Sequence, residues 1–424
     1  MPAVNHTLVD RTVEEVERAT EEIVQLTADL VRIPTVNPPG AEYDTCARFL
    51  GEFLSRRAFE VEYITADGLA EHTVRHPRVN VIGTKQGARA GRGIHLNGHI
   101  DVVPPGEGWT LDPFAGIVRD GRVYGRGVCD MKAGIAAAVF AAEAIARAGI
   151  DLPGTLEISG TVDEESGGFA GVAHLAKIQR LEKSRTAFVI IPEPLNVDRI
   201  CIGHRGVYWF ELTAKGRIAH GSIPFHGISA IDAMGEVLAS IRRELEPALG
   251  TRITAMPVVP DGARHATINI NGVEGGQRVD GIQTPCVADR CRAVFDRRFL
   301  IEEGFAAAKS EITALIARAM ARVPGVDYEM RDLMVVDPVR TPDGSPLVGA
   351  LDVAIQRVLG VSAKLVASPG TYDHKHVTRI AGITDCVAYG PGELELAHQP
   401  DESCAVADIV NATKVIALAM LELA

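Results

Sequence analysis

Alternation between helix-like and strand-like spacing of apolar residues dominates the first half of the chain. Apolar positions recur at helical spacing from Val13 to Ile33 and again, in an Ala-rich stretch, from Met131 to Ile150. Short apolar runs of strand length lie at 92–103, 155–162 and 187–191. Strands that alternate with helices predict a mostly parallel sheet, whose ligand sites lie at the carboxyl ends of the strands.

The pattern changes after about Gly203. Strand-like runs, the first of them alternating as half-exposed strands do, now accompany two amphipathic helices; the runs lie at 207–213, 267–273 and 291–299, and the helices at 230–245 and 306–322. Two helices and a small antiparallel sheet together predict an inserted α+β domain.

The length of the chain supports this division. At 424 residues it exceeds what a single hydrophobic core usually holds. A strand near 384–389 belongs to the pattern of the first half, so we expect residues 1–204 and 330–424 to form one domain and residues 205–329 the inserted one. The predicted fold class is α/β, with a mostly parallel-sheet domain that carries the insertion.

Composition excludes several classes of partner. A formal net charge of −12 disfavours nucleic acid and anionic membranes, because such partners need clustered Lys and Arg. Apolar runs stay shorter than the ~18 residues of a membrane span. Seven scattered cysteines without paired spacing are typical of a reducing compartment. We therefore expect a cytoplasmic protein that acts on a small molecule, with no nucleic-acid or membrane partner.

Polar side chains of metal-binding type end two of the predicted strands. Asp101, two residues after His99 on the same side of an extended segment, can orient the histidine ring or simply accept from a backbone amide. Glu164 and Glu165 directly follow the next strand. Neighbours in an extended chain point in opposite directions, so one carboxylate can bind metal while the other faces water. The alternatives are a hydrogen-bonded histidine and a solvated acidic turn.

Three further residues complete a candidate metal set. Asp130 precedes a predicted helix, Glu193 follows a short strand, and His398 lies in the loop beyond the last strand. Taken alone, Asp130 reads as a helix N-cap and Glu193 as an exposed turn residue. With His99 and Glu165 they form what a hydrolase needs to hold two divalent cations. Imidazole and carboxylate ligands without thiolate suit zinc, manganese or cobalt.

At these residues the chain resembles a known enzyme family over nearly its whole length. The family is the two-metal deacylases and exopeptidases, which includes acetylornithine deacetylase, succinyl-diaminopimelate desuccinylase, aminoacylase and glutamate carboxypeptidase. The segments that carry the resemblance are Leu30–Gly40, Gly98–Pro104, Gly125–Gly134, Asp163–Glu165, Glu193–Pro194 and Ala219–Ser222.

The resemblance implies how the metal set is shared. His99, Asp130 and Glu193 would hold one metal ion, and Asp130, Glu165 and His398 would hold the other. Asp130 would bridge the two ions, so two divalent cations per chain are expected.

The resemblance also implies roles for residues outside the metal set. Asp101 would orient His99, and Glu164 would be the general base. His220, in the inserted lid and dimerisation domain, would stabilise the oxyanion, often from the partner subunit of a homodimer. Arg298 would grip a substrate carboxylate, for which a surface ion pair is the alternative, and Gly370 and Thr371 would contact substrate.

The expected activity is metal-dependent hydrolysis of a C–N bond. The resemblance implies deacylation of an N-acyl amino acid or a related amide by a metal-bridged water that Glu164 deprotonates, and Glu193, where several peptidase relatives use aspartate, favours it. An exopeptidase or dipeptidase is one alternative. Hydrolytic release of an amine from an aromatic amine is another, because residues 372–376 are unusually rich in aromatic and basic groups. A non-catalytic binding protein on the same fold is a remote alternative.

Overall fold

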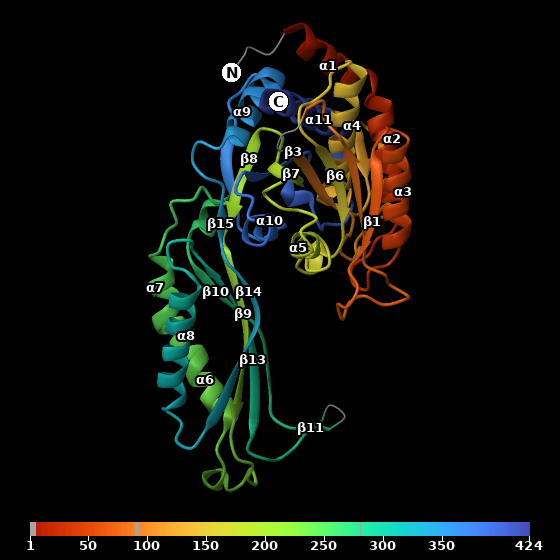
Figure 1. The fold of residues 1–424 in the computed structure, drawn as a ribbon. Coiled ribbons are helices and arrows are strands. Elements are labelled where there is room, and N and C mark those ends of the chain that lie inside the picture. The colour runs from red at the N-terminus through yellow and green to blue at the C-terminus, as the bar shows by residue number, and fades with distance from the viewer. Residues whose placement is uncertain (1–5, 90–92, 280–281) are drawn as a thin grey trace. The chain divides into compact units, whose positions relative to one another are not determined.

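The computed structural model describes residues 6–89, 93–279 and 282–424, which fold into two compact units (Figure 1). Within the described residues, the first unit takes in the chain up to Gly203 together with 340–366 and 372–424, and the second unit takes in 204–339 and 367–371. The second unit extends beyond the expected residue 329, because the strand β14 (Asp327–Val336) pairs with a strand of its sheet.

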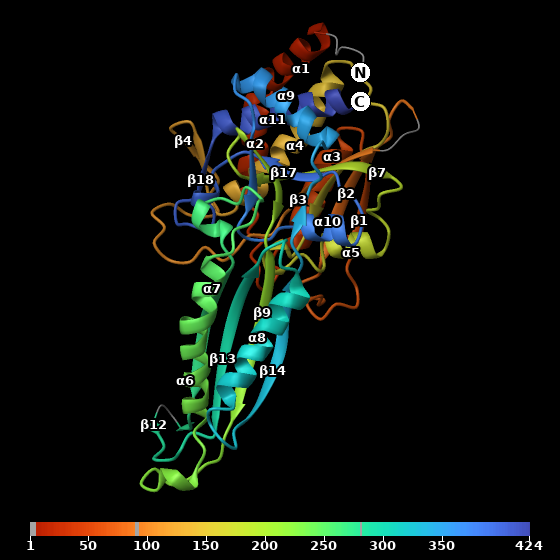
Figure 2. The ribbon, with the colours of Figure 1, turned by 90° about the vertical axis from the view of Figure 1, so that its left-hand side faces the viewer.

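The first unit is built on a nine-stranded sheet with a parallel centre (Figure 2). The strands β3, β6, β7 and β17 pair in parallel, which confirms the predicted fold class. The strand order is β1 (Glu60–Thr65), β2 (Val79–Lys85), β6 (Leu156–Thr161), β3 (Gly93–His99), β7 (Thr186–Pro194), β17 (Cys386–Gly390), β8 (Arg199–His204) and β15 (Val339–Arg340), with β16 (Lys364–Ser368) beside β8. A separate small sheet has the order β18 (Ser403–Ala405), β5 (Arg122–Tyr124) and β4 (Ile117–Arg119).

Among the helices of this unit, α4 (Ala133–Arg147) packs against the centre of the sheet. Its small side chains allow close approach, and a Cβ atom at Gly134 would lie 2.0 Å from the carbonyl oxygen of Pro192. The other helices are α1 (His6–Arg18), α2 (Thr20–Val31), α3 (Tyr43–Ser55), α5 (Val172–Lys177), α9 (Pro346–Leu359), α10 (His374–Arg379) and α11 (Val406–Leu423), with short turns η1 (Val128–Lys132), η2 (Glu164–Ser166) and η6 (Leu394–Leu396). None of the helices in the described part of the chain is both long and apolar enough to span a membrane.

The single helix expected from Val13 to Ile33 is in fact two, because the chain breaks at Ala19. The hydroxyl of Thr20 donates to the carbonyl of Glu17 at 2.8 Å. A side-chain hydroxyl that donates to a backbone carbonyl competes with the regular backbone hydrogen bonds of a helix. The spacing of apolar residues does not reveal such a break.

The central strand β3 presents one apolar and one polar face. Gly98 faces α4, where an added Cβ would lie 2.4 Å from Ile135. Side chains alternate along a strand, so His95, Asn97 and His99 point to the opposite face. All three are buried. The polar face of β3 therefore lies inside the protein and ends at His99.

The second unit is an antiparallel sheet covered by helices, as expected for an α+β domain. Its core includes Phe210 and Phe295, whose rings stack with centroids 4.8 Å apart. The strand order is β10 (Thr267–Gly275), β13 (Arg290–Phe299), β9 (Gly206–Lys215) and β14, beside the strand pair β11 (Arg278–Val279) and β12 (Ile282–Gln283); the helices are α6 (Ala230–Ser240), α7 (Glu246–Gly250) and α8 (Phe305–Met320), with short turns η3 (Pro224–His226), η4 (Ile241–Leu245) and η5 (Asp261–Arg264).

Candidate metal centre and active site

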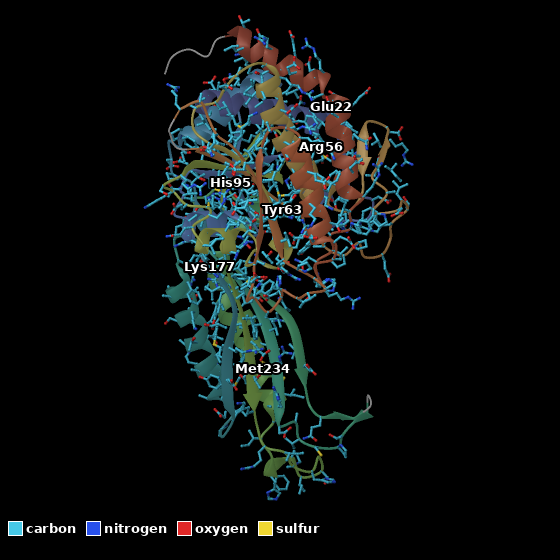
Figure 3. All side chains as sticks on the ribbon, turned by 45° about the vertical axis from the view of Figure 1, so that its right-hand side comes forward. Glu22, Arg56, Tyr63, His95, Lys177 and Met234 are labelled. Atoms are coloured by element: carbon cyan, nitrogen blue, oxygen red, sulfur yellow. The ribbon has the colours of Figure 1, made fainter. Side chains whose placement is uncertain are left out.

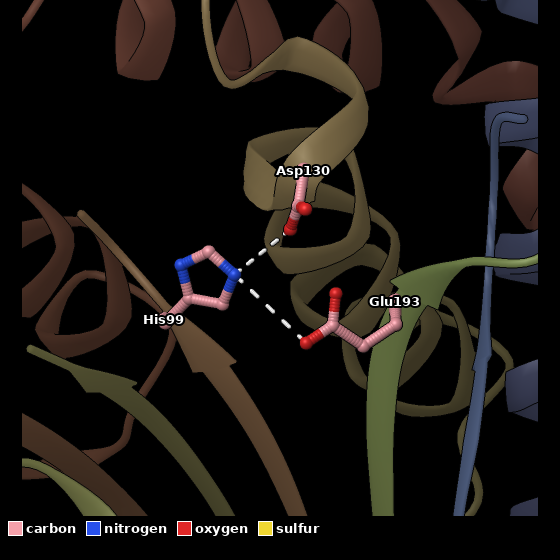
Figure 4. A group of neighbouring side chains, drawn as sticks. All are labelled: His99, Asp130 and Glu193. Carbon is pink, nitrogen blue, oxygen red and sulfur yellow. Dashed lines mark hydrogen bonds and ion pairs between the residues drawn. The ribbon is translucent and has the colours of Figure 1, made fainter. Parts of the chain in front are cut away.

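The first group of metal-binding side chains gathers where β3 ends. His99 Nε2 lies 2.9 Å from Asp130 Oδ1 and 3.9 Å from Glu193 Oε1 (Figure 4). Asp130 belongs to the turn η1 that leads into α4, and its peptide bond to Met131 is cis. Glu193 lies inside β7, because this strand continues past the expected end at residue 191 to Pro194. Three separate segments thus bring one ligand atom each to the same place.

A second group shares Asp130 with the first. His398 Nε2 lies 3.1 Å from Glu165 Oε1 and 3.5 Å from Asp130 Oδ2. Asp130 therefore turns one oxygen towards His99 and the other towards His398. In each group the possible ligand atoms all lie within 4.8 Å of one another.

The electrostatics of the two groups are those of crowded, buried acids. Burial raises the pKa of Glu165 to about 7, in spite of its hydrogen bond to His398 and with a further contribution from the charge of Asp130. Burial, again with Asp130, raises the pKa of Glu193 well above its usual value. Burial also disfavours ionisation of Asp130, but hydrogen bonds from His398 and His99 outweigh it and hold the pKa of this carboxyl well below its usual range.

The two groups fit a pair of divalent cations. They combine imidazole nitrogens and carboxylate oxygens without cysteine, a set that suits borderline and hard metal ions. A cation between these oxygens would offset both the burial and the mutual repulsion of the acids. The arrangement therefore supports two metal ions that share Asp130.

Asp101 fixes the segment that carries Glu164 and Glu165. Its backbone oxygen lies 3.0 Å from His99 Nδ1, while its buried carboxylate accepts hydrogen bonds from the backbone N–H groups of Glu164 (3.2 Å) and Glu165 (3.1 Å) and from Asn37 Nδ2 (3.0 Å). The carboxylate of Asp101 therefore accepts backbone amides, as its alternative interpretation expects, while the atom nearest to the His99 ring is the backbone oxygen and Oδ1 lies farther away, 3.6 Å from Nδ1.

The pair Glu164-Glu165 lies in the single turn η2 rather than in an extended segment. The two carboxylates nevertheless separate. Glu165 contacts His398, whereas Glu164 Oε1 lies 3.5 Å from Lys375 Nζ. Their divergence comes from the partners that α10 and the His398 loop supply.

A buried ion pair that sequence reasoning did not single out joins the Asp130 turn to the His398 loop. Arg126 Nη1 donates to Glu402 Oε2 at 2.5 Å, and Glu402 also accepts from the backbone N–H groups of Gly127 and Cys129 at 3.1 and 2.8 Å. Arg126 Nη2 donates to the carbonyl of His398 at 3.2 Å. Arg126 stands in the Gly-rich approach to Asp130, but its partner is 276 residues away and leaves no local signal.

The remaining candidates, His220, Arg298, Gly370 and Thr371, belong to the second unit. His220 is exposed, and its Nδ1 accepts from the backbone N–H of Ser222 at 3.1 Å. Arg298 makes two hydrogen bonds to Asp296, at 2.8 and 2.9 Å, so the ion pair considered as its alternative is present. The backbone N–H of Gly370 donates to Ser368 Oγ at 3.1 Å.

Fold and site together define a metal-dependent hydrolase. Residues 95–422 match Peptidase family M20/M25/M40. The chain belongs to this family, which confirms the resemblance seen in its motifs, and it is a metal-dependent amidohydrolase that cleaves amide or peptide C–N bonds.

Relatives by sequence cover nearly the whole chain. A succinyl-diaminopimelate desuccinylase of Xanthomonas campestris pv. campestris (strain 8004) is 28% identical over 397 residues, which are 92% of this chain and 96% of the relative. The enzyme of the same name from Granulibacter bethesdensis is 29% identical over 395 residues, covering 91% and 94%.

Solved structures share the fold at lower identity. Human carnosine dipeptidase 1 has a TM-score of 0.76 at 19% identity, with 98% of both chains covered. A dinuclear metal-binding peptidase of this family from Bacillus subtilis has a TM-score of 0.69 at 18% identity, covering 96% of this chain and 99% of that one.

The buried ion pair between Arg126 and Glu402 leads to a prediction about stability. Replacing Glu402 with Ala leaves the buried guanidinium of Arg126 without its carboxylate partner and three backbone N–H groups without their acceptor. We therefore expect the free energy of unfolding to fall by about 3–5 kcal/mol. Urea denaturation of the purified variant measures this. The control is Glu236→Ala, which removes a half-exposed pair with Arg322 and should change stability by about 0–1 kcal/mol. Equal effects of the two substitutions would contradict the role given to Glu402.

Proposed function

We propose that this protein is a deacylase that releases an amine from an N-acyl amino acid or a related small amide, with Glu164 as its general base. The observation that carries the proposal is the divergence of the neighbouring carboxylates: Glu165 contacts His398 in a metal-binding group, while Glu164 stays outside both groups. Asp101 holds both backbones, so the two roles are assigned to fixed positions.

Two bound cations would polarise the scissile carbonyl and make a water molecule more acidic, and we propose zinc, manganese or cobalt. His99, Asp130 and Glu193 would hold one cation, and Asp130, Glu165 and His398 the other. The Glu164 carboxylate accepts a proton from the water whose oxygen attacks the carbonyl carbon. As the C–N bond breaks, Glu164 donates this proton to the leaving nitrogen, and the products are an amine and a carboxylic acid, which then ionises to the carboxylate.

The second unit would supply substrate contacts. Because Nδ1 of His220 accepts from Ser222, its proton is carried on Nε2, where it can be donated to a developing oxyanion. Arg298 would bind a substrate carboxylate after giving up one of its two hydrogen bonds to Asp296. Gly370 and Thr371 would also contact the substrate. An exposed His220 supports a homodimer in which this residue serves the partner's site.

The relatives support the choice of substrate class. Those named succinyl-diaminopimelate desuccinylase match over more than nine-tenths of the chain, which favours an N-acyl amino acid. Dipeptides are the second candidate, since the structural neighbours include a dipeptidase. We also propose a cytoplasmic location, because all seven cysteines are free.

The proposal predicts the outcome of a substrate panel. The purified protein, loaded with zinc, manganese or cobalt in turn, is offered N-succinyl, N-acetyl and N-formyl amino acids, dipeptides and substituted anilines, and amine release is measured. We expect turnover of one aliphatic N-acyl class. Turnover of dipeptides alone would replace the deacylase by a peptidase, and turnover of aromatic amines alone would reject both.

The role of Glu164 predicts a specific kinetic defect. Glu164→Gln keeps the size of the side chain but removes the base, so we expect the rate to fall on the order of 10²–10⁴-fold while the protein keeps two metal equivalents per chain. Metal analysis and steady-state kinetics measure the two quantities. The matched variant Glu165→Gln should lose metal as well as activity. Near-normal turnover of a fully loaded Glu164→Gln would contradict the assignment.

The role of His220 predicts complementation between two inactive variants. In a twofold dimer that pairs Glu164→Gln with His220→Ala, one site keeps Glu164 and receives His220 from the partner. Random exchange of subunits should therefore restore about a quarter of wild-type activity. Gel filtration checks that both variants are dimers. If activity stays at the level of the unmixed variants, His220 does not act across a dimer.

A further inference from the structure

A buried lysine stands beside the proposed general base. Lys375 is in the first turn of α10, within the unbroken buried run of residues 372–376. Only 5% of its side chain is exposed, and its Nζ lies 3.5 Å from Glu164 Oε1, which belongs to a side chain that is 11% exposed. A charged group removed from water needs a charged or hydrogen-bonding partner, and Glu164 supplies a carboxylate within reach of this ammonium. The charge of Lys375 also acts on the carboxyl of Asp373, two residues before it, and lowers the pKa that burial raises there.

The start of α10 is locked onto the turn that carries Glu164. His376 Nε2 lies 2.7 Å from the carbonyl oxygen of Gly167, and the His376 ring packs on Phe169 with centroids 5.5 Å apart. Gly168 approaches so closely that a Cβ atom there would lie 2.5 Å from Asp373 Oδ1. The position of Lys375 relative to η2 is therefore set by packing on both sides of it.

The polar face of the central sheet also contacts the segment that leads into α10. Asn97 Nδ2 donates to Asp373 Oδ2 at 3.2 Å, and Ser159 Oγ donates to Asn97 Oδ1 at 2.8 Å. The series continues to His95, which lies among the packed side chains of the first unit (Figure 3). From His95 the series continues to Glu157, 3.1 Å away, and Glu157 in turn accepts a hydrogen bond from Arg180 at 2.6 Å. A hydrogen-bonded series thus runs from β6 and β3 to Asp373, the residue directly before α10.

We propose that Lys375 is a positioning residue for catalysis: it holds the Glu164 carboxylate in the orientation from which it takes and returns the proton. This rests on the proposed function of Glu164. Lys375 itself contacts neither metal-binding group. A carboxylate already fixed by a buried ammonium has little orientational freedom left to lose when the reaction begins, whereas an unheld carboxylate must first be ordered.

The test compares three variants on the N-acyl amino acid that the wild type cleaves fastest. Lys375→Met keeps an unbranched side chain of similar length without charge, and we expect kcat to fall about 10–100-fold, with KM and two metal equivalents retained. Lys375→Arg restores the cation and should recover most of kcat. The control is Lys177→Met on the neighbouring helix α5, whose lysine is exposed (Figure 3) and whose loss should leave kcat unchanged.

A double-mutant cycle distinguishes an effect of Lys375 that acts through Glu164 from an effect that does not depend on Glu164. If Lys375 acts through Glu164, then Lys375→Met should cause no further loss in a Glu164→Gln background. An equal loss in both backgrounds, or loss of metal from Lys375→Met, would overturn the inference. Should Lys375→Met fail to fold, Lys375→Gln makes the same comparison.

A crystal structure of Lys375→Met tests positioning without any substrate. We expect the Glu164 side chain to change orientation or to occupy more than one, and an unchanged Glu164 would overturn the inference. Failure of the proposed function is distinct from failure of this inference. In the first case Glu164→Gln keeps normal turnover; in the second Glu164→Gln is impaired but Lys375→Met is not.

Discussion

In the first unit, negative charge is buried where the central parallel strands end, and the surrounding structure is arranged to compensate it. A carboxylate removed from water is strongly destabilising unless it is paired or hydrogen-bonded. Each acid at this end of the sheet has such a partner, supplied by another segment of the chain. The pairs are Arg78 with Asp163, Arg126 with Glu402 and Lys375 with Glu164, and the acids of the two metal-binding groups face His99 and His398.

The hydrogen bonds that stabilise these buried carboxylates also fix the residues of the proposed active site. Asp101 and Glu402 each accept backbone N–H groups, and they thereby fix the turns that carry Glu164, Glu165 and Asp130. Because these acceptors are buried, the turns have little freedom to move. The neighbouring glutamates can then take different roles, one near His398 and the other near Lys375, as the proposed mechanism requires. A site that preorganises its charges in this way needs little rearrangement during the reaction.

The fold leaves the choice of substrate open. Its structural neighbours include dipeptidases, while the relatives by sequence are named desuccinylases, and one scaffold commonly serves several activities. Residues of the second unit, His220 and Arg298 among them, are proposed to recognise the substrate. The aromatic and basic side chains at 372–376 are buried, and they have a structural role: His376, for example, contacts the carbonyl oxygen of Gly167, next to the turn that carries Glu164. These residues therefore give no support to an aromatic substrate.

The amino-acid sequence by itself determined the class of fold, the strands and helices with clear apolar periodicity, and the residue types at the strand ends, because apolar periodicity and chain-breaking residues act over a few positions. The period of two in His95, Asn97, His99 and Asp101 also marks a polar strand face, which the prediction of an apolar strand over this segment does not include. Only the tertiary structure decided which charges meet. Glu165 and His398 are 233 residues apart, Glu164 and Lys375 are 211 apart, and Arg126 and Glu402 are 276 apart. Such partners are brought together by the order of strands in the sheet, which no local pattern encodes.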